Sequence, residues 1–189
     1  MNFDLRDYII VLENIIPHEL CDEVIDEYKN DDYWINTTVR SDAANRELRR
    51  CDAIDISDNF IIEKNQEKRK NIDDKLFVVA CDAIQKYNDK FGILKIQTAG
   101  DSGYTLLRYR EGAFYSQHTD HFLQAPRTVS CSFTLNDNFE GGEFGFFNRE
   151  LTYNPPKGSA IMFPSNFLYP HETMPVKRHV RYSIITWFI

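Results

Sequence analysis

The chain has 189 residues, 42% of them hydrophobic, and its 22 Lys plus Arg and 29 Asp plus Glu give a formal net charge of −7. This length is that of one compact domain. An acidic chain without a basic stripe lacks the feature that gathers phosphate backbones, so the charge balance disfavours nucleic acid as a partner.

The first residues bear on location. The longest apolar run there, Tyr8 to Leu12, is far shorter than the ~20 residues of a membrane helix, so we expect no membrane span. Asp4 and Asp7 stand where a secretory signal carries positive charge. The spacing of the four cysteines fits neither a zinc ribbon nor a redox pair. A reducing, cytoplasmic location is therefore expected.

The first half of the chain predicts two helices and little sheet. Residues 8–12 are typical of a short strand, and Pro17 then opens a helix with apolar residues on one face. Residues 31–58 are polar and irregular, and we expect a mobile loop there that runs into a strand. From Gln66 to about Lys90 apolar residues recur every three or four positions between charged ones, which indicates an amphipathic helix.

The second half predicts a β structure. β-Branched and aromatic residues dominate after Gly92, and Gly, Pro and Asn clusters recur at short intervals. Short strands without a helix between them favour a closed or two-sheet antiparallel fold such as a jelly roll. We thus expect an α+β, mainly β, single domain in which residues 1–97 give helix-rich support to a core over 98–189. The expected strands are Gly103–Tyr109, Arg127–Leu135, Gly142–Phe147, Ser159–Phe163, His171–Val176 and Val180–Phe188.

Three side chains in the β half are candidate metal ligands. His118 and Asp120 are two residues apart, and in extended chain such residues point to the same face, so both can bind one ion. The third ligand, His171, must come from another strand. Two histidines and one carboxylate leave open positions that suit Fe(II), whereas zinc more often has closed tetrahedral ligation. The His-x-Asp pair also arises by chance, and alone it favours no site.

Arg181 adds to this signal because it lies ten residues beyond His171. If Val176 and Val180 flank a hairpin turn, His171 and Arg181 lie on adjacent strands and face one pocket. A dicarboxylic cosubstrate would then chelate the ion at one end and pair with Arg181 at the other. Ser183 shares the face of Arg181 and would hydrogen-bond the same carboxylate.

Several stretches keep the order and spacing of one enzyme family over residues 104–188. They are Arg108-Tyr109 through Gly112 to His118-Thr119-Asp120, Thr134-Leu135-Asn136-Asp137, Glu140-Gly141-Gly142-Glu143-Phe144, Pro156-Lys157-Gly158, Phe163-Pro164, His171 with Pro175-Val176, and Arg181 to Phe188. With these stretches the chain resembles the iron(II) and 2-oxoglutarate dependent dioxygenases, specifically the prolyl 4-hydroxylase-like group. A looser match over Val11 to Ile25 resembles the family's N-terminal strand and helix.

The resemblance implies a double-stranded β-helix (jelly roll) in which His118, Asp120 and His171 hold Fe(II) and Arg181 binds the far carboxylate of 2-oxoglutarate. It implies a reaction that consumes 2-oxoglutarate and O2, releases succinate and CO2 and hydroxylates the substrate, with ascorbate as the expected reductant. Asp120 favours hydroxylation, since the related halogenases lack that carboxylate.

Four further residues are candidate cosubstrate contacts. Tyr109 stands at the position of a family tyrosine, and Ser183 and Trp187 share the face of Arg181 by alternation. Thr134 stands where the family has a second tyrosine, so that hydrogen bond is shorter or missing. The glycine usual in the last hairpin is also absent. Gly141 and Gly142 are expected to supply a turn or bulge rather than a ligand contact.

The substrate implied is a proline-containing peptide or protein, and the acidic first half favours basic targets. Alternatives stay open: a nucleic-acid repair dioxygenase, a hydroxylase of a free amino acid or other small molecule, and a dioxygenase fold used only as a binding module. Loss of a metal ligand would mark the last, and none is lost. Arg46, Arg49 and Arg50 indicate a solvated face, with a lid over residues 36–50 as the lesser alternative. The oligomeric state is not predicted.

Overall fold

The computed structural model describes residues 4–37, 39–41, 46–58, 65–91, 96–124 and 126–189. Within these residues the helical segments are η1 (Leu5–Tyr8), α1 (His18–Tyr28) and α2 (Gln66–Asp89). The strands are β1 (Ile10–Leu12), β2 (Ile35–Asn36), β3 (Val39–Ser41), β4 (Arg46–Arg50), β5 (Asp52–Asp55), β6 (Thr105–Tyr109), β7 (Phe114–His118), β8 (Val129–Thr134), β9 (Glu140–Gly141), β10 (Phe144–Phe146), β11 (Leu151–Tyr153), β12 (Ala160–Pro164), β13 (His171–Thr173), β14 (Val176–Arg178) and β15 (Arg181–Phe188).

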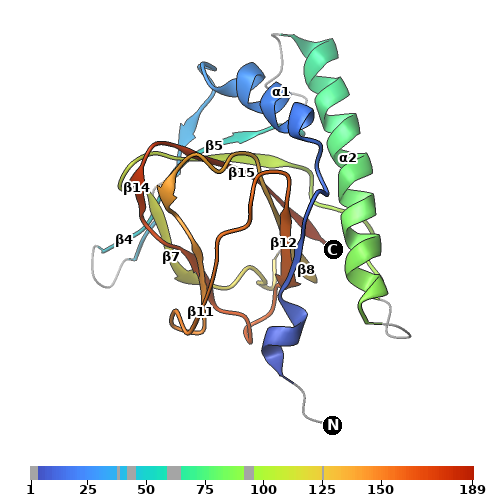
Figure 1. The fold of residues 1–189 in the computed structure, drawn as a ribbon, viewed down its shortest axis with the longest axis vertical. Coiled ribbons are helices and arrows are strands. Elements are labelled where there is room, and N and C mark those ends of the chain that lie inside the picture. Colours follow the sequence, from blue (N-terminus) through green and yellow to red (C-terminus); the bar gives the residue numbers. More distant parts are fainter. Residues whose placement is uncertain (1–3, 38, 42–45, 59–64, 92–95, 125) are drawn as a thin grey trace.

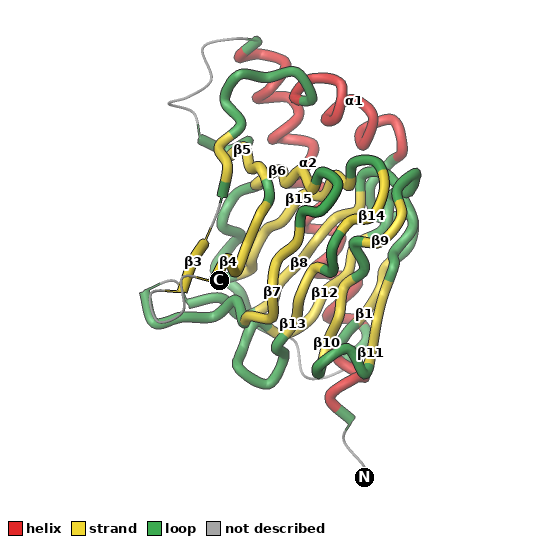
Figure 2. The backbone as a smooth tube through the Cα atoms, turned by 90° about the vertical axis from the view of Figure 1, so that its left-hand side faces the viewer, coloured by secondary structure: helices red, strands yellow, loops and turns green. Residues whose placement is uncertain are grey.

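Two large antiparallel sheets face each other (Figures 1 and 2). The seven-stranded sheet has the order β1-β12-β8-β15-β6-β5-β2, and the six-stranded sheet has the order β11-β10-β13-β7-β4-β3. β14 and β9 form a separate two-stranded sheet. Helices α1 and α2 lie outside the seven-stranded sheet (Figure 1). The prediction of a mainly β, two-sheet fold with supporting helices is confirmed.

The alternation of side chains along β15 explains how one sheet serves two purposes. Ile184 and Phe188 point outward into the main apolar core, which they share with residues of both helices. Arg181, Ser183 and Trp187 point inward and line a cavity between the two large sheets. Because side chains of a strand alternate between faces, the same strand builds the core and presents polar groups to the cavity.

Helix α2 matches the amphipathic segment that the sequence pattern predicted. Its inward residues Ile72 and Leu76 are fully buried, and Tyr87 Oη donates a hydrogen bond to the Tyr8 carbonyl at 2.9 Å. Arg69 is buried on the same helix and pairs with Glu27, at 3.0 Å, and with Asp31. These contacts fix the helix layer on the outer face of the sheet.

The structure differs from the sequence prediction in residues 31–58. Where a loop running into one strand was expected, the described residues form β2, β3, β4 and β5. β4 pairs with β7 of one sheet and β5 pairs with β6 of the other, so Cys51 alone carries the chain between the two sheets. The prediction missed β4 because its charged sequence, Arg46 to Arg50, lacks apolar alternation. The lid, which was the lesser alternative for residues 36–50, includes residues 38 and 42–45, which lie outside the described residues.

Candidate functional site

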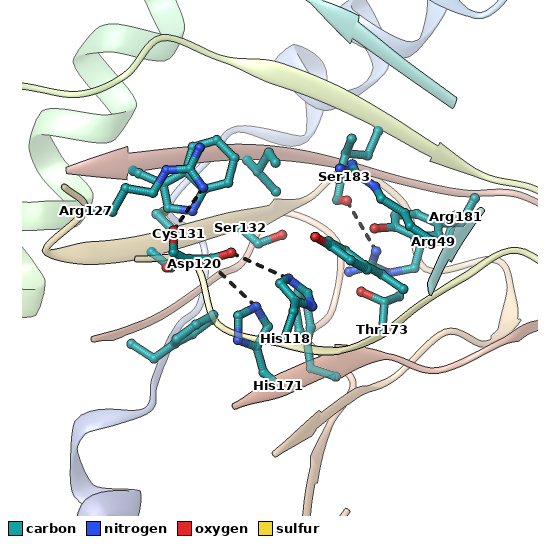
Figure 3. A pocket seen from close by; sticks show the side chains of 18 residues that line it. Arg49, His118, Asp120, Arg127, Cys131, Ser132, His171, Thr173, Arg181 and Ser183 are labelled. Atoms are coloured by element: carbon teal, nitrogen blue, oxygen red, sulfur yellow. Dashed lines mark hydrogen bonds and ion pairs between the residues drawn. The ribbon is translucent and has the colours of Figure 1, made fainter. Parts of the chain in front are cut away.

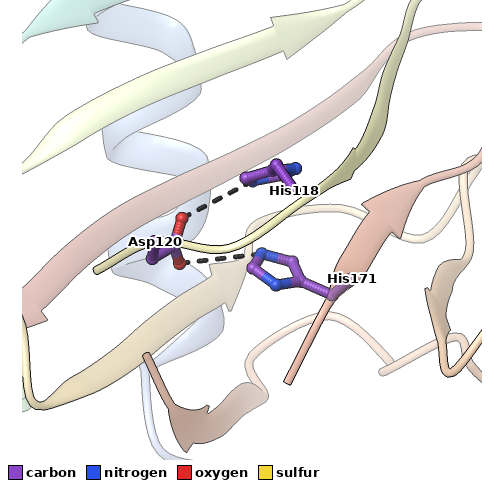
Figure 4. A group of neighbouring side chains, drawn as sticks. All are labelled: His118, Asp120 and His171. Atoms are coloured by element: carbon purple, nitrogen blue, oxygen red, sulfur yellow. Dashed lines mark ion pairs between the residues drawn. The ribbon is translucent and has the colours of Figure 1, made fainter. Parts of the chain in front are cut away.

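Three side chains that can bind a metal meet in the cavity. β7 and β13 pair with His118 opposite His171, which brings both imidazoles together. Asp120 follows β7 by two residues, and its carboxylate oxygens lie 3.5 Å from His118 Nε2 and 3.6 Å from His171 Nε2 (Figure 4). One donor atom from each residue lies within 4.8 Å of the others. Donor atoms at these separations can all lie at about 2.1 Å from one ion after small adjustments.

Backbone carbonyls orient both histidine rings. His118 Nδ1 donates to the Ser116 carbonyl at 2.9 Å, and His171 Nδ1 donates to the Tyr169 carbonyl at 3.1 Å. Since a carbonyl only accepts, the proton of each neutral ring is on Nδ1, and the lone pair of Nε2 points toward Asp120. Burial lowers the pKa of His171 to about 4, so this ring is neutral at pH 7.

The Asp120 carboxylate is ionised and held in place. Burial would raise its pKa, but interaction with the His118 and His171 rings in their protonated form and the hydrogen bond from Ser130 outweigh burial and hold the pKa below the usual range. Ser130 Oγ donates to Asp120 Oδ2 at 2.6 Å and lies 2.8 Å from Ser165 Oγ. Two imidazoles and one oriented carboxylate form the donor set that suits Fe(II) with open positions.

Arg181 lies at the other end of the cavity (Figure 3). Its side chain is 2% exposed, its Nη1 donates to Ser183 Oγ at 3.3 Å, and its Nη2 is buried without a hydrogen-bond partner in the described part of the chain. The rings of Tyr109 and Phe144 lie 5.3 and 5.0 Å from the guanidinium carbon. Burial lowers the pKa of Arg181. A buried guanidinium that lacks a counter-charge favours an anionic ligand.

The hairpin predicted between His171 and Arg181 is wrong. β13 pairs with β7 and β10 in the six-stranded sheet, whereas β15 pairs with β6 and β8 in the seven-stranded sheet. The intervening β14 pairs with β9, and His179, with a φ of 64°, turns the chain into β15. His171 and Arg181 therefore line one cavity from opposite sheets. Pro175, which interrupts the strand predicted over His171–Val176, is the signal that the prediction missed.

The other predicted contacts divide into two groups. Tyr109, Ser183 and Trp187 line the cavity, whose volume of about 150 Å³ has room for on the order of ten water-sized groups. Thr134 pairs with Ser183 in register and is buried, but it is not among the residues that line the cavity. Its Oγ1 has no hydrogen-bond partner in the described residues. The contact of Thr134 with a bound cosubstrate therefore stays a prediction.

Two cavity arginines were not predicted as site residues. Arg127 lies between the cavity and its rim, with its guanidinium carbon 3.4 Å from the centre of the Trp187 ring and its Nη1 donating to the Asp120 carbonyl at 3.1 Å. Arg49 extends from β4 and lies over the Tyr115 ring at 4.7 Å. Neither had a sequence signal, because the pairing of β4 with β7 and the path of the loop after Asp120 are tertiary features.

The sequence-family model of the 2OG-Fe(II) oxygenase superfamily matches residues 104–189. This range contains His118, Asp120 and His171 as well as Arg181. Residues 104–189 belong to the 2OG-Fe(II) oxygenase superfamily. The prediction of that family is confirmed.

Curated relatives match part of the chain. A PKHD-type hydroxylase of Idiomarina loihiensis is 33% identical over 89 residues, which are 44% of this chain and 40% of the relative. A PKHD-type hydroxylase of Crocosphaera subtropica is 34% identical over 89 residues, 42% of this chain and 39% of the relative. The match thus spans about two fifths of the length of these relatives.

Solved structures match nearly the whole chain. A prolyl hydroxylase from Trichoplax adhaerens, in complex with a peptide fragment of hypoxia inducible factor, superposes with a TM-score of 0.73 at 19% identity over 97% of this chain and 84% of that one. A Pseudomonas putida prolyl-4-hydroxylase superposes with a TM-score of 0.68 at 20% identity, over 96% of this chain and 92% of that one. A viral collagen prolyl hydroxylase from Paramecium bursaria Chlorella virus-1 superposes with a TM-score of 0.67 at 17% identity, over 95% of this chain and 94% of that one. The chain shares their double-stranded β-helix fold.

Among the helices that the structure describes, none has both the length and the apolar sequence of a membrane-spanning segment.

Proposed function

We propose that this chain is an Fe(II)- and 2-oxoglutarate-dependent dioxygenase that hydroxylates a proline residue of a peptide. One observation carries the proposal: a metal-binding set of two histidines and one carboxylate shares a cavity with Arg181, a buried guanidinium that has no carboxylate partner within the described residues. A dicarboxylic ligand satisfies both ends at once, since one end chelates the ion and the other pairs with the guanidinium.

The roles follow from the positions. His118, Asp120 and His171 would hold Fe(II), which together with 2-oxoglutarate and O2 supplies oxidative decarboxylation coupled to hydroxylation. Arg181 and Ser183 would bind the far carboxylate of 2-oxoglutarate. The Tyr109 and Phe144 rings beside the buried Arg181 would strengthen this charge-assisted pair, because a less polar environment than water screens charges less. Ascorbate is the proposed reductant, which would keep the iron in its Fe(II) state.

The substrate class rests on the fold and on the cavity mouth. The Trichoplax prolyl hydroxylase with the same fold holds a peptide. In this chain the loop after Asp120 and the loop after β12 lie side by side, since the His121 amide donates to the Ser165 carbonyl at 2.9 Å. Phe122, Leu123 and Phe167 on these two loops are exposed. Exposed apolar side chains on neighbouring loops favour an extended peptide over a small polar molecule.

Arg127 favours a second candidate, a hydroxylase of a free amino acid. Its guanidinium stacks on Trp187 and has no carboxylate partner within the described residues. It would accept the carboxylate of a free amino acid, a group that an internal proline of a peptide lacks. A substrate panel separates the two candidates.

The test is succinate formation from 2-oxoglutarate with Fe(II), ascorbate and air, followed by a panel of proline peptides and free amino acids read for the gain of one oxygen atom by mass spectrometry. We expect uncoupled succinate formation by the wild type and its loss in His171→Ala and Arg181→Ala. The matched controls are His18→Ala and Arg178→Ala, which remove an exposed histidine and an exposed arginine. If the folded wild type binds neither metal nor 2-oxoglutarate, the proposed function is wrong and the result favours the binding-module alternative. Turnover of a free amino acid alone would overturn the peptide substrate.

A further inference from the structure

Arg49 is a third guanidinium in the cavity and has no part in the proposal above. It lies on β4, directly opposite Tyr115 of β7, and its guanidinium carbon is 4.7 Å from the centre of the Tyr115 ring. Its Nε donates to Cys51 Sγ at 3.1 Å. The side chain thus lines the cavity beside Arg181 and Thr173 (Figure 3).

Arg49 differs from its neighbour Arg50 in what it binds. Arg50 is exposed on the opposite face of β4 and forms an ion pair with Glu47 at 2.6 Å. Arg49 has Cys51 Sγ as its one hydrogen-bond acceptor within the described residues, and no carboxylate there lies within ion-pair distance. A thiol is a weak acceptor, so the two Nη groups of Arg49 are left for another partner.

Arg49 and Arg181 share the same neighbours. Both guanidinium groups interact electrostatically with Tyr109 and with Cys51, although they come from strands of different sheets. The Asp120 carboxylate acts instead on Arg127, near the rim. Two guanidinium groups thus line the same cavity. An anion bound in contact with both would offset the repulsion between these like charges.

We propose that Arg49 is a second binding residue for the far carboxylate of 2-oxoglutarate, which it holds together with Arg181. This inference rests on the proposed function and adds a cosubstrate contact from β4. It also accounts for Thr134. That residue stands where the resemblance places a tyrosine hydroxyl, and Arg49 supplies from another strand the hydrogen bonds that Thr134 does not give.

The test is a comparison of two 2-oxo acids, one with and one without the far carboxylate. Binding of 2-oxoglutarate and of 2-oxovalerate to the Mn(II)-loaded protein is measured by calorimetry, without turnover. The variants are Arg49→Met, which keeps the aliphatic stem, and Arg50→Met, which makes the same change on the exposed face of the strand. Circular dichroism and a Mn(II) titration check that each variant is folded and binds metal.

We expect Arg49→Met to weaken 2-oxoglutarate binding by about tenfold to a hundredfold, the range of one or two charge-assisted hydrogen bonds, and to leave 2-oxovalerate binding unchanged. Arg50→Met should change neither. Equal weakening of both acids would place Arg49 at the metal end or in a structural role and overturn the inference, as would an unchanged affinity for 2-oxoglutarate. If Arg49→Met does not fold, Arg49→Lys replaces it in the same calorimetry. A loss of 2-oxoglutarate affinity that is less than threefold larger than the loss of 2-oxovalerate affinity then overturns the inference. A wild type that fails to bind 2-oxoglutarate overturns the proposed function as well.

Discussion

The hydroxyl of Ser130 offers a direct test of how the metal-binding set is held. It donates to Asp120 Oδ2 at 2.6 Å in a buried place. A hydrogen bond to a buried charged group contributes about 1.5 to 3 kcal/mol, and the same bond orients the carboxylate toward the ion. We therefore expect Ser130→Ala to lower metal affinity by about tenfold to a hundredfold.

The assay is a Co(II) titration followed by the visible absorption of the bound ion, with Mn(II) competition to extend the range. The matched control is Ser132→Ala, two residues along β8. Ser132 also lines the cavity, but its Oγ has no hydrogen-bond partner in the described residues. Metal affinity that is unchanged in Ser130→Ala, or lowered equally in both variants, would refute the reasoning.

Three more predictions concern stability and cosubstrate binding. Gly142 has a φ of 70°, and an added Cβ would lie 3.0 Å from Arg181 Cδ. Gly142→Ala should therefore lower the free energy of unfolding in urea by about 1 to 2 kcal/mol and weaken 2-oxoglutarate binding measured by calorimetry. An affinity equal to that of the wild type would contradict a role for this contact in placing Arg181. Arg69→Met removes the guanidinium that pairs with the buried Asp31 carboxylate, whereas Glu27 keeps Lys68 and Asn65 as partners. Urea unfolding should therefore show a loss of about 3 kcal/mol, and a loss under about 1 kcal/mol would contradict this. Burial raises the pKa of Glu27, but hydrogen bonds from Lys68, Asn65 and Arg69 outweigh burial and lower the pKa below 4.5. The ionised Glu27 therefore stabilises the fold fully above pH 4.5, and this stabilisation is lost as the pH falls through the folded-state pKa. Glu27→Gln should accordingly reduce the fall of the urea unfolding midpoint between pH 4.5 and lower pH.

Part of this molecule could be predicted from the sequence because the signals are local. The three-to-four residue spacing in α2 follows from helix geometry, and β6, β8, β10, β12, β13 and β15 follow from β-branched and aromatic residues between turns. Four strands of the same region, β7, β9, β11 and β14, were not predicted. The spacing of His118 and Asp120 and the position of His171 predicted the three side chains that the structure brings together. Their role as iron ligands stays a prediction.

The rest could not be predicted because it depends on which strands pair. Nothing local in Arg46 to Arg50 says that β4 adds to β7, so Arg49 was expected on a solvated face or a lid. The hairpin failed for the same reason: sequence proximity suggested that β13 and β15 are neighbours, whereas β14 pairs elsewhere and the two strands face each other across the cavity.

The passage of the chain through Cys51 has a consequence for dividing the protein. β4 completes one sheet against β7, β5 completes the other against β6, and β1 covers the edge of β12. A fragment reduced to the superfamily region, residues 104–189, would expose three strand edges at once, and open edges invite pairing with other chains. Such a fragment would retain the three metal-binding side chains and Arg181 but would lack the cavity wall from which Arg49 extends. The boundary of sequence similarity is therefore not a boundary at which this fold can be cut.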